Sequence, residues 1–238
     1  RQEMQDFGDA FGLAVRLVAT ADRDLLEIIG LSLRVSLSAV GMACLLGLPM
    51  GAALAISRFP GRPAVVVLLN ALMGLPPVVV GLLIYLLLSN AGPLGWLRLL
   101  YSPTAMIVAQ TVLITPIVAA LSREIVEPLH SEYGEQFRSW CLSRRQAVGA
   151  LLWDARYSLL TVALAGFGRA VAEVGAVIIV GGNIDHLTRV MTTAIALETS
   201  KGDLALALAL GIVLVTIALS VNAAVMMLRM TATRYAYA

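Results

Sequence analysis

Four stretches of this chain contain no Asp, Glu, Lys or Arg: residues 35–57, 63–97, 99–122 and 204–228. Each is long enough to cross a hydrocarbon layer of about 30 Å as a helix, which takes roughly 20 residues. A fifth stretch, 157–184, is interrupted only by Arg169 and Glu173. Charged residues make up 13% of the 238 residues, about half the usual share in a soluble domain. The pattern predicts an all-α, polytopic membrane protein with about five transmembrane helices.

The five spans are expected at residues 27–57, 64–89, 103–125, 158–181 and 204–230. Residues 1–25 place apolar side chains at helical spacing among charged ones, which predicts an amphipathic segment lying in the membrane interface. Residues 26–230 then form a single transmembrane domain, and 231–238 form a tail. The basic residues are scattered along the chain, so we expect no nucleic-acid partner. The histidines and cysteines are isolated as well, so we expect no metal site.

The long connection at 126–157 sets the orientation of the spans. If it faces the cytoplasm, most of the arginines between spans fall on the inner side, as the positive-inside tendency requires. The N-terminus is then outside and the C-terminus inside.

The same connection carries large apolar residues among its arginines, including Phe137, Trp140, Leu151 and Trp153. Apolar residues in such a polar segment indicate short amphipathic helices seated in the groove of a partner protein. A helix lying on the inner leaflet, with its arginines on lipid phosphates, explains the same composition. The residues alone leave both interpretations open.

This connection resembles the cytoplasmic motif of ABC importer permeases: Glu-Ala-Ala, three residues, Gly, nine residues, Ile-x-Leu-Pro. Glu135, Cys141 and Leu151 fall at the glutamate, glycine and isoleucine positions, and Ser143 begins a pair similar to the Ser-Arg that usually follows the glycine. The family's glycine and proline are themselves replaced. The resemblance implies coupling helices that dock on a separate ATPase subunit. The residues expected at that contact are Glu135, Phe137, Arg138, Trp140, Cys141, Leu142, Ser143, Arg144, Leu151 and Trp153.

Two more segments resemble permeases for oxyanions. Residues 75–82 are similar to the second-span signature of molybdate and tungstate permeases, and 166–184 are similar to the Arg-x-x-Gly-Glu-x-Gly-Ala…Gly-Asn pattern of sulfate, molybdate and tungstate permeases. Ala172 replaces the glycine before the glutamate, as in the tungstate branch. The residues expected to line the translocation path, or to serve as structural pairs, are Pro76, Pro77, Gln110, Arg169, Glu173 and Asn183.

Arg169 and Glu173 are four residues apart, which would place them on one face of a single helix. An ionisable side chain at mid-span is costly unless it is paired or faces water. We favour a structural clamp, because a strong anion site on the path would hinder release of the substrate. Attraction of a dianion by Arg169 is the alternative.

The resemblance covers nearly all of residues 25–230 and implies the type I importer permease architecture in the cytoplasmic (inner) membrane of a prokaryote. It also implies a homodimer, an ATPase subunit that binds ATP and Mg, and an extracytoplasmic oxyanion-binding protein. In this interpretation the chain itself holds no cofactor and catalyses no reaction. It contains no Gly-x-x-x-x-Gly-Lys loop for hydrolysing ATP by that route.

We therefore predict a permease that passes a tetrahedral oxyanion by alternating access, with tungstate as the favoured substrate. A molybdate or sulfate permease of the same family is the alternative. A stand-alone secondary transporter is less favoured, because such proteins usually contain internal repeats. A non-transport membrane protein would leave the prolines within the spans and the loop tryptophans unexplained.

Overall fold

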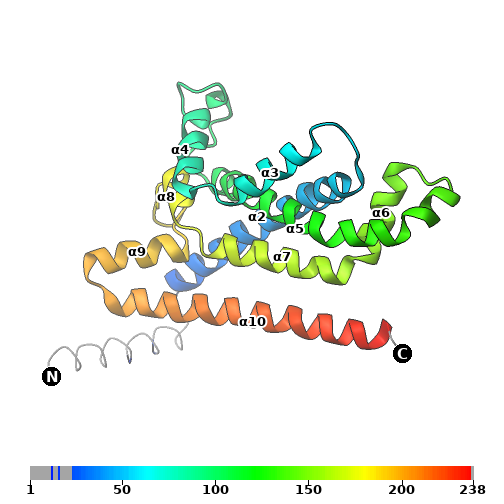
Figure 1. Ribbon diagram of the computed structural model, residues 1–238. Helices are drawn as coiled ribbons and strands as arrows, with labels where there is room; N and C mark the ends of the chain where they lie inside the picture. Colours follow the sequence, from blue (N-terminus) through cyan, green and yellow to red (C-terminus); the bar gives the residue numbers. More distant parts are fainter. Residues whose placement is uncertain (1–11, 13–15, 17–22, 237–238) are drawn as a thin grey trace. The chain divides into compact units, whose positions relative to one another are not determined.

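The computed structural model describes Gly12, Arg16 and residues 23–236, and within these residues all regular structure is helical (Figure 1). The interfacial segment expected at 1–25 therefore lies almost entirely outside the described residues. The chain divides into two compact units. The described residues up to Leu37 belong to the first unit with Pro77–Gln110 and Val171–Ser220, and the second contains Ser38–Pro76, Thr111–Ala170 and the residues from Val221 onward.

Three helices are long and apolar enough to cross a membrane: α2 (Arg23–Ile56), α5 (Pro103–Ser139) and α10 (Leu204–Ala236). At a rise of 1.5 Å per residue each is about 50 Å long or more, which exceeds the hydrocarbon thickness. The number of spans rises to as many as five if each of two bent helix pairs counts as one. The expected count of about five lies at the upper end of this range.

The span expected at 64–89 is broken into α3 (Arg62–Met73) and α4 (Pro77–Leu88). Each has 12 residues, or about 18 Å, which is too short to cross alone. Pro76 and Pro77 explain the break, because a residue before proline is disfavoured in the helical region and proline lacks the backbone N–H. Pro77 instead takes the first position of α4, where a missing N–H costs nothing.

The expected helix at 158–181 is also interrupted. α6 (Arg144–Asp154) and α7 (Arg156–Val171) meet at a bend of 80°, and α8 (Gly175–Gly181) begins only after a non-helical segment at 172–174. The third span, expected at 103–125, is longer than predicted and is not interrupted. α5 does not end near 125 but continues through Pro128 to Ser139, so that the first half of the 126–157 connection is helical.

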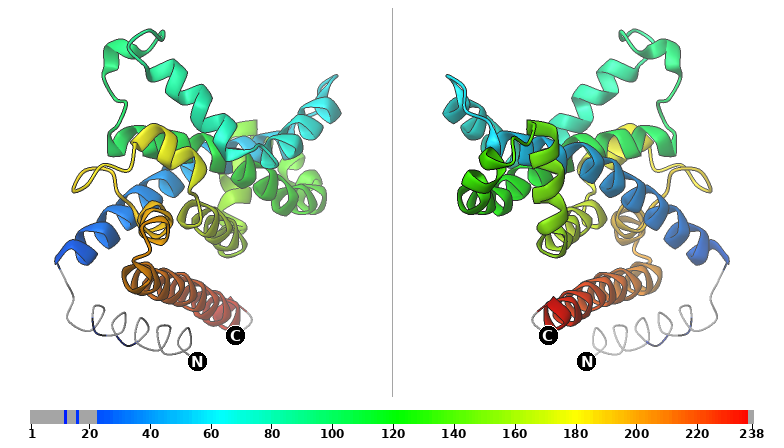
Figure 2. Two further views of the ribbon diagram at one scale, coloured as in Figure 1. Left: turned by 90° about the vertical axis from the view of Figure 1, so that its left-hand side faces the viewer. Right: turned by 90° about the vertical axis from the view of Figure 1, so that its right-hand side faces the viewer.

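In the first unit, α4 packs against α8 (Figures 1 and 2). The contact is close at two glycines: a Cβ at Gly81 would lie 2.7 Å from Ala176 Cα, and one at Gly175 would lie 2.8 Å from Val78 Cγ2. α9 (Met191–Lys201) ends at Gly202, whose φ is 85°. A 3₁₀ turn, η1 (Gly95–Leu97), precedes α5.

The start of α2, α9 and α10 share an apolar core in the same unit. Its buried members are Leu25, Met191, Ala194, Ala209 and Leu210. The Ser32 hydroxyl accepts a hydrogen bond from the Met191 N–H (2.7 Å), which joins α2 to the first turn of α9.

In the second unit, the end of α2, the C-terminal half of α5 and α6 enclose a smaller core. Its buried members are Ala52, Ala55, Val126 and Leu151, and Phe137 and Val148 pack around them. This core fixes the position of α6 on the two longer helices.

Candidate functional site

A groove of about 1170 Å³ lies in the second unit between the end of α2, the first residue of α3, the C-terminal half of α5 and α6. Its wall is polar and of mixed charge. The charged residues that line it are Arg58, Arg62, Glu127, Glu132, Glu135, Arg138 and Arg144. Such alternating charge suits recognition of a protein partner with complementary charges better than capture of a small anion.

Glu127 braces one side of the groove. Its carboxylate accepts from Arg62 Nη2 and from Arg123 Nη1, each at 2.6 Å. Arg62 Nε also donates to the Leu54 carbonyl at 3.1 Å. The Glu127 carboxylate thus links the start of α3 to the middle of α5. Arg62 in turn links α3 to α2, because it also donates to the Leu54 carbonyl.

The turn between α5 and α6 contains Cys141, whose φ is 54°. A side chain in this left-handed region costs roughly 1–2 kcal/mol, a cost that glycine avoids. Cys141 falls at the glycine position of the permease motif that the sequence resembles. Glycine would adopt the conformation found at this position without strain.

α6 begins with a capping box formed by Ser143 and Gln146. The Ser143 N–H donates to Gln146 Oε1 (2.9 Å), and the Gln146 N–H donates to Ser143 Oγ (3.4 Å). This reciprocal pair satisfies two backbone donors that a helix start would otherwise leave open. Ser143 thus has a structural role that its Ser-x-x-Gln spacing would have revealed.

The groove brings together six of the ten residues predicted at the ATPase contact: Glu135, Phe137, Arg138, Cys141, Leu142 and Arg144. Four others lie elsewhere. Ser143 caps α6, and Leu151 is 0% exposed in the core, so any effect it has on a partner is indirect. Trp140 and Trp153 are 67% and 72% exposed and do not line the groove. The apolar residues of this segment therefore divide into internal packing and two exposed tryptophans.

Arg169 and Glu173 are not on one helix. α7 ends at Val171 and Glu173 lies in the non-helical segment before α8, so the expectation that both residues lie on one helix is wrong. Pairing of the two side chains stays a prediction. Glu173 is 4% exposed, and its Oε1 accepts the Ala176 N–H at 3.0 Å. Its carbonyl accepts from Thr192 Oγ1 at 2.9 Å. The side chain thus holds the start of α8, and the backbone holds α9.

The remaining path candidates occupy separate places. Pro76 and Pro77 form the break before α4, and Gln110 is buried within α5. Asn183 has a φ of 50° and follows Gly182, whose φ is 72°. Asparagine is one of the few residues enriched in this left-handed region, which explains its presence in the turn after α8.

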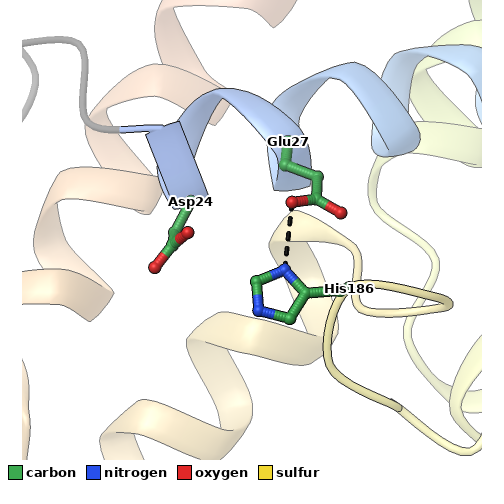
Figure 3. A group of neighbouring side chains, drawn as sticks. All are labelled: Asp24, Glu27 and His186. Carbon is green, nitrogen blue, oxygen red and sulfur yellow. Dashed lines mark hydrogen bonds and ion pairs between the residues drawn. The ribbon is translucent and has the colours of Figure 1, made fainter.

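A group of potential metal ligands lies in the first unit at the start of α2, where Asp24 and Glu27 approach His186 (Figure 3). Their ligand atoms lie within 4.8 Å of one another, and all three residues are exposed. His186 Nδ1 lies 3.0 Å from Glu27 Oε2, and this hydrogen bond, with the charge of Asp185, raises the pKa of His186. The His186–Glu27 contact joins residues 159 apart, a separation that hid it from sequence analysis.

No protein-family model matches the chain. A probable anion ABC transporter permease protein of Haloferax volcanii is 39% identical over 185 residues, which cover 76% of this chain and 80% of that protein. The tungstate uptake system permease protein TupB of Peptoclostridium acidaminophilum is 37% identical over 226 residues, or 95% of this chain and 99% of that protein. The sulfate transport system permease protein CysW of Escherichia coli K12 is 28% identical over 187 residues, or 73% and 62% of the two chains.

Proposed function

The chain belongs to the ABC transporter permease family that includes anion and tungstate permeases, and from this premise we propose that it is the membrane-spanning subunit of an ATP-driven tungstate importer. The observation that most supports tungstate as the substrate is the match to a tungstate permease over nearly the whole of both chains. The match to sulfate permeases is weaker and covers less of either chain.

Molybdate is the second candidate substrate, because molybdate and tungstate are tetrahedral dianions of nearly equal size. Residues proposed along the path, such as Gln110 and Asn183, carry neutral amides. Such groups can hydrogen-bond a passing oxyanion without trapping it. Discrimination between the two anions is therefore assigned to an extracytoplasmic binding protein that delivers the substrate.

The chemistry of ATP hydrolysis is assigned to a partner ATPase subunit, which binds ATP and Mg. This chain is the non-catalytic translocation subunit and acts with a second copy of itself. In this proposal the groove between α5 and α6 faces the cytoplasm and receives the ATPase, with the N-terminus of the chain outside and the C-terminus inside. Its mixed charge and its size of about 1170 Å³ support this assignment.

The packing of α6 explains how ATPase movement would reach the membrane. Leu151 lies in a core with Ala52 of α2 and Val126 of α5. A displacement of α6 therefore shifts the ends of two long helices together, because close-packed side chains transmit movement rather than absorb it. Alternating access follows when this shift opens the spans to the outer side.

Glu173 is assigned a structural role in this mechanism. Its carboxylate would repel a dianion, and one of its oxygens is already occupied by the Ala176 N–H. It holds the interruption between α7 and α8 in place and does not bind the substrate.

The substrate is tested by measuring tungsten and molybdenum by mass spectrometry in cells lacking the chain, at scarce supply of both. Loss of tungsten with normal molybdenum is the expected result. Loss of both elements would mean a shared importer, and no change in either would reject tungstate and molybdate as the substrate. Co-purification of an ATPase separates the ABC mechanism from an ATP-independent secondary transporter.

The coupling role is tested with Glu135→Arg, which reverses a charge on the groove wall. We expect ATP-driven uptake to be abolished while the amount of protein in the membrane stays normal. Glu124→Arg is the matched control, because Glu124 is an exposed residue of α5 that does not line the groove. Undiminished uptake by the Glu135 variant would show that the groove is not the ATPase contact.

A further inference from the structure

The junction between α6 and α7 carries an exposed group of three side chains, Trp153, Arg156 and Tyr157, here named the junction cluster. The Arg156 guanidinium carbon lies 4.9 Å from the centre of the Trp153 ring and 4.5 Å from that of Tyr157. Arg156 Nη1 donates to the Trp153 carbonyl at 2.7 Å. The guanidinium is thus held against both rings, and the three side chains form one preassembled surface.

The three side chains of this surface face outward. Trp153, Arg156 and Tyr157 are exposed, whereas Leu151, Ala155 and Leu159 beside them are buried. Trp153, at 72% exposed, is among the most exposed large apolar residues of the described chain. The indole ring is thus available to a partner that accepts an aromatic side chain.

The position of the cluster along the chain identifies that partner. α7 begins at Arg156, and the next charged residue is Arg169, 13 residues later. The uncharged segment between them is about 20 Å long as a helix. Tryptophan, tyrosine and arginine at the start of an apolar helix are the residues that settle at the boundary between lipid headgroups and acyl chains.

We propose that the junction cluster binds the phosphate of an anionic phospholipid in the inner leaflet, with Trp153 and Tyr157 at the level of the glycerol and carbonyl groups. Stacking on the rings uses the faces of the guanidinium, whereas a phosphate binds its N–H edge. Basic side chains on the cytoplasmic side also gain from the negative surface potential of the membrane. The inference rests on the proposed inward orientation of the groove but not on the identity of the transported anion.

The competing partner is the ATPase, to which Trp153 was assigned from the sequence. Trp153 does not line the groove, whereas Glu135 and Arg138 do. Trp140 provides a matched comparison, because it is 67% exposed and lies in the turn before α6. α6 separates it from α7 by 11 residues, or about 16 Å. Two tryptophans of similar exposure thus lie at opposite ends of one short helix, and only Trp153 adjoins the apolar segment of α7.

The first test uses quenching of tryptophan fluorescence by lipids. The permease–ATPase complex is reconstituted in vesicles of phosphatidylethanolamine and phosphatidylglycerol that contain phosphatidylcholine brominated high on its acyl chains. A red-shifted tryptophan analogue in the permease allows its selective excitation. Trp96→Phe with Trp140→Phe leaves Trp153 as reporter, and Trp96→Phe with Trp153→Phe leaves Trp140.

We expect Trp153 to lose most of its fluorescence to the brominated lipid, with or without bound ATPase, and Trp140 to lose little. A Trp153 signal that the lipid does not quench would overturn the proposal. So would quenching that disappears when the ATPase binds, because the ATPase would then be the partner.

The second test concerns Arg156 and does not use fluorescence. Replacing phosphatidylglycerol by phosphatidylcholine should lower the unfolding temperature of the complex. Arg156→Gln should remove most of this dependence on lipid charge, Arg156→Lys should keep part of it, and Asp154→Asn should not weaken it. An Arg156→Gln variant with the full lipid dependence would contradict a phosphate contact.

Discussion

The α5–α6 hairpin and the α4–α8 pair are held together by different means. The hairpin uses a capping box at the start of α6 and an apolar core that Leu151 of α6 shares with Val126 of α5. The α4–α8 pair uses close approach of backbones at Gly81 and Gly175, with no room for a methyl group. Replacement of a single polar side chain should therefore weaken the hairpin only in part. A single added carbon should disrupt the α4–α8 contact outright.

Gly81→Ala should have the largest effect. The new Cβ would lie 2.7 Å from Ala176 Cα, so the helices must separate, and overpacking of this kind costs about 1–3 kcal/mol. A thermal unfolding scan of the purified protein measures the loss. Gly168→Ala is the control, because no atom lies within 4 Å of a Cβ there. It should be neutral or stabilise α7 by about 0.5–1 kcal/mol. Equal stability of the two variants would contradict the close contact.

Ser143→Ala should have a smaller effect on the hairpin. Loss of an N-cap side chain costs about 1 kcal/mol. Ser143→Asp should retain most of the stability, because aspartate also caps helix starts. The midpoint of unfolding in denaturant, measured for each variant, gives the difference in stability. An alanine variant as stable as the unmodified protein would show that the capping box does not hold α6.

Cys141→Gly should stabilise the same turn slightly. It removes the cost of a side chain at a φ of 54°, about 1–2 kcal/mol, but it adds the entropy cost of glycine, about 0.5–1 kcal/mol. The net gain is about 0–1.5 kcal/mol and should appear as a higher unfolding temperature. Cys141→Ala keeps the side-chain cost and serves as the control. A gain as large in alanine as in glycine would reject backbone strain as the cause.

The smallest expected effect is the pH dependence of the His186–Glu27 contact. The hydrogen bond that His186 donates to the Glu27 carboxylate raises the pKa of His186 above its ordinary 6.5, with further contributions from the charges of Asp185 and Asp24. A group whose folded pKa is raised stabilises the fold below its unfolded pKa and loses this contribution as the pH rises through the folded value. The unfolding temperatures of the unmodified protein and Glu27→Gln should therefore converge as the pH rises through that value. A gap that is constant with pH would contradict the ion pair.

The long helices could be predicted from the sequence because their signal is the absence of charge. α2, α5 and α10 each contain more than 20 uncharged residues, and a helix is the form in which such a segment satisfies its own backbone in lipid. The break at Pro76–Pro77 also has a local cause. The break at 172–174 has none visible in composition, because Glu173 stabilises it through the Ala176 N–H only once the chain has turned.

The candidate site was predictable in part. The motif spacing located six residues of the groove, because they lie close together along the chain. It did not reveal that Leu151 is internal, since an aliphatic residue has the same appearance in a core and at a contact. The brace on Glu127 joins residues 65 apart, and the His186–Glu27 pair joins residues 159 apart. Contacts at such separations arise from the folded arrangement, and one sequence carries no periodic signal for them.

Cys141 gives the groove a native chemical reporter. It is exposed on the groove wall, whereas the other cysteine of the chain, Cys44, is half-buried within α2. A water-soluble maleimide should therefore react first at Cys141, without any engineered cysteine. The rate of alkylation at Cys141 is then proportional to the fraction of time for which the groove is uncovered. Measured with and without nucleotide, it would follow each engagement of a partner in native membranes.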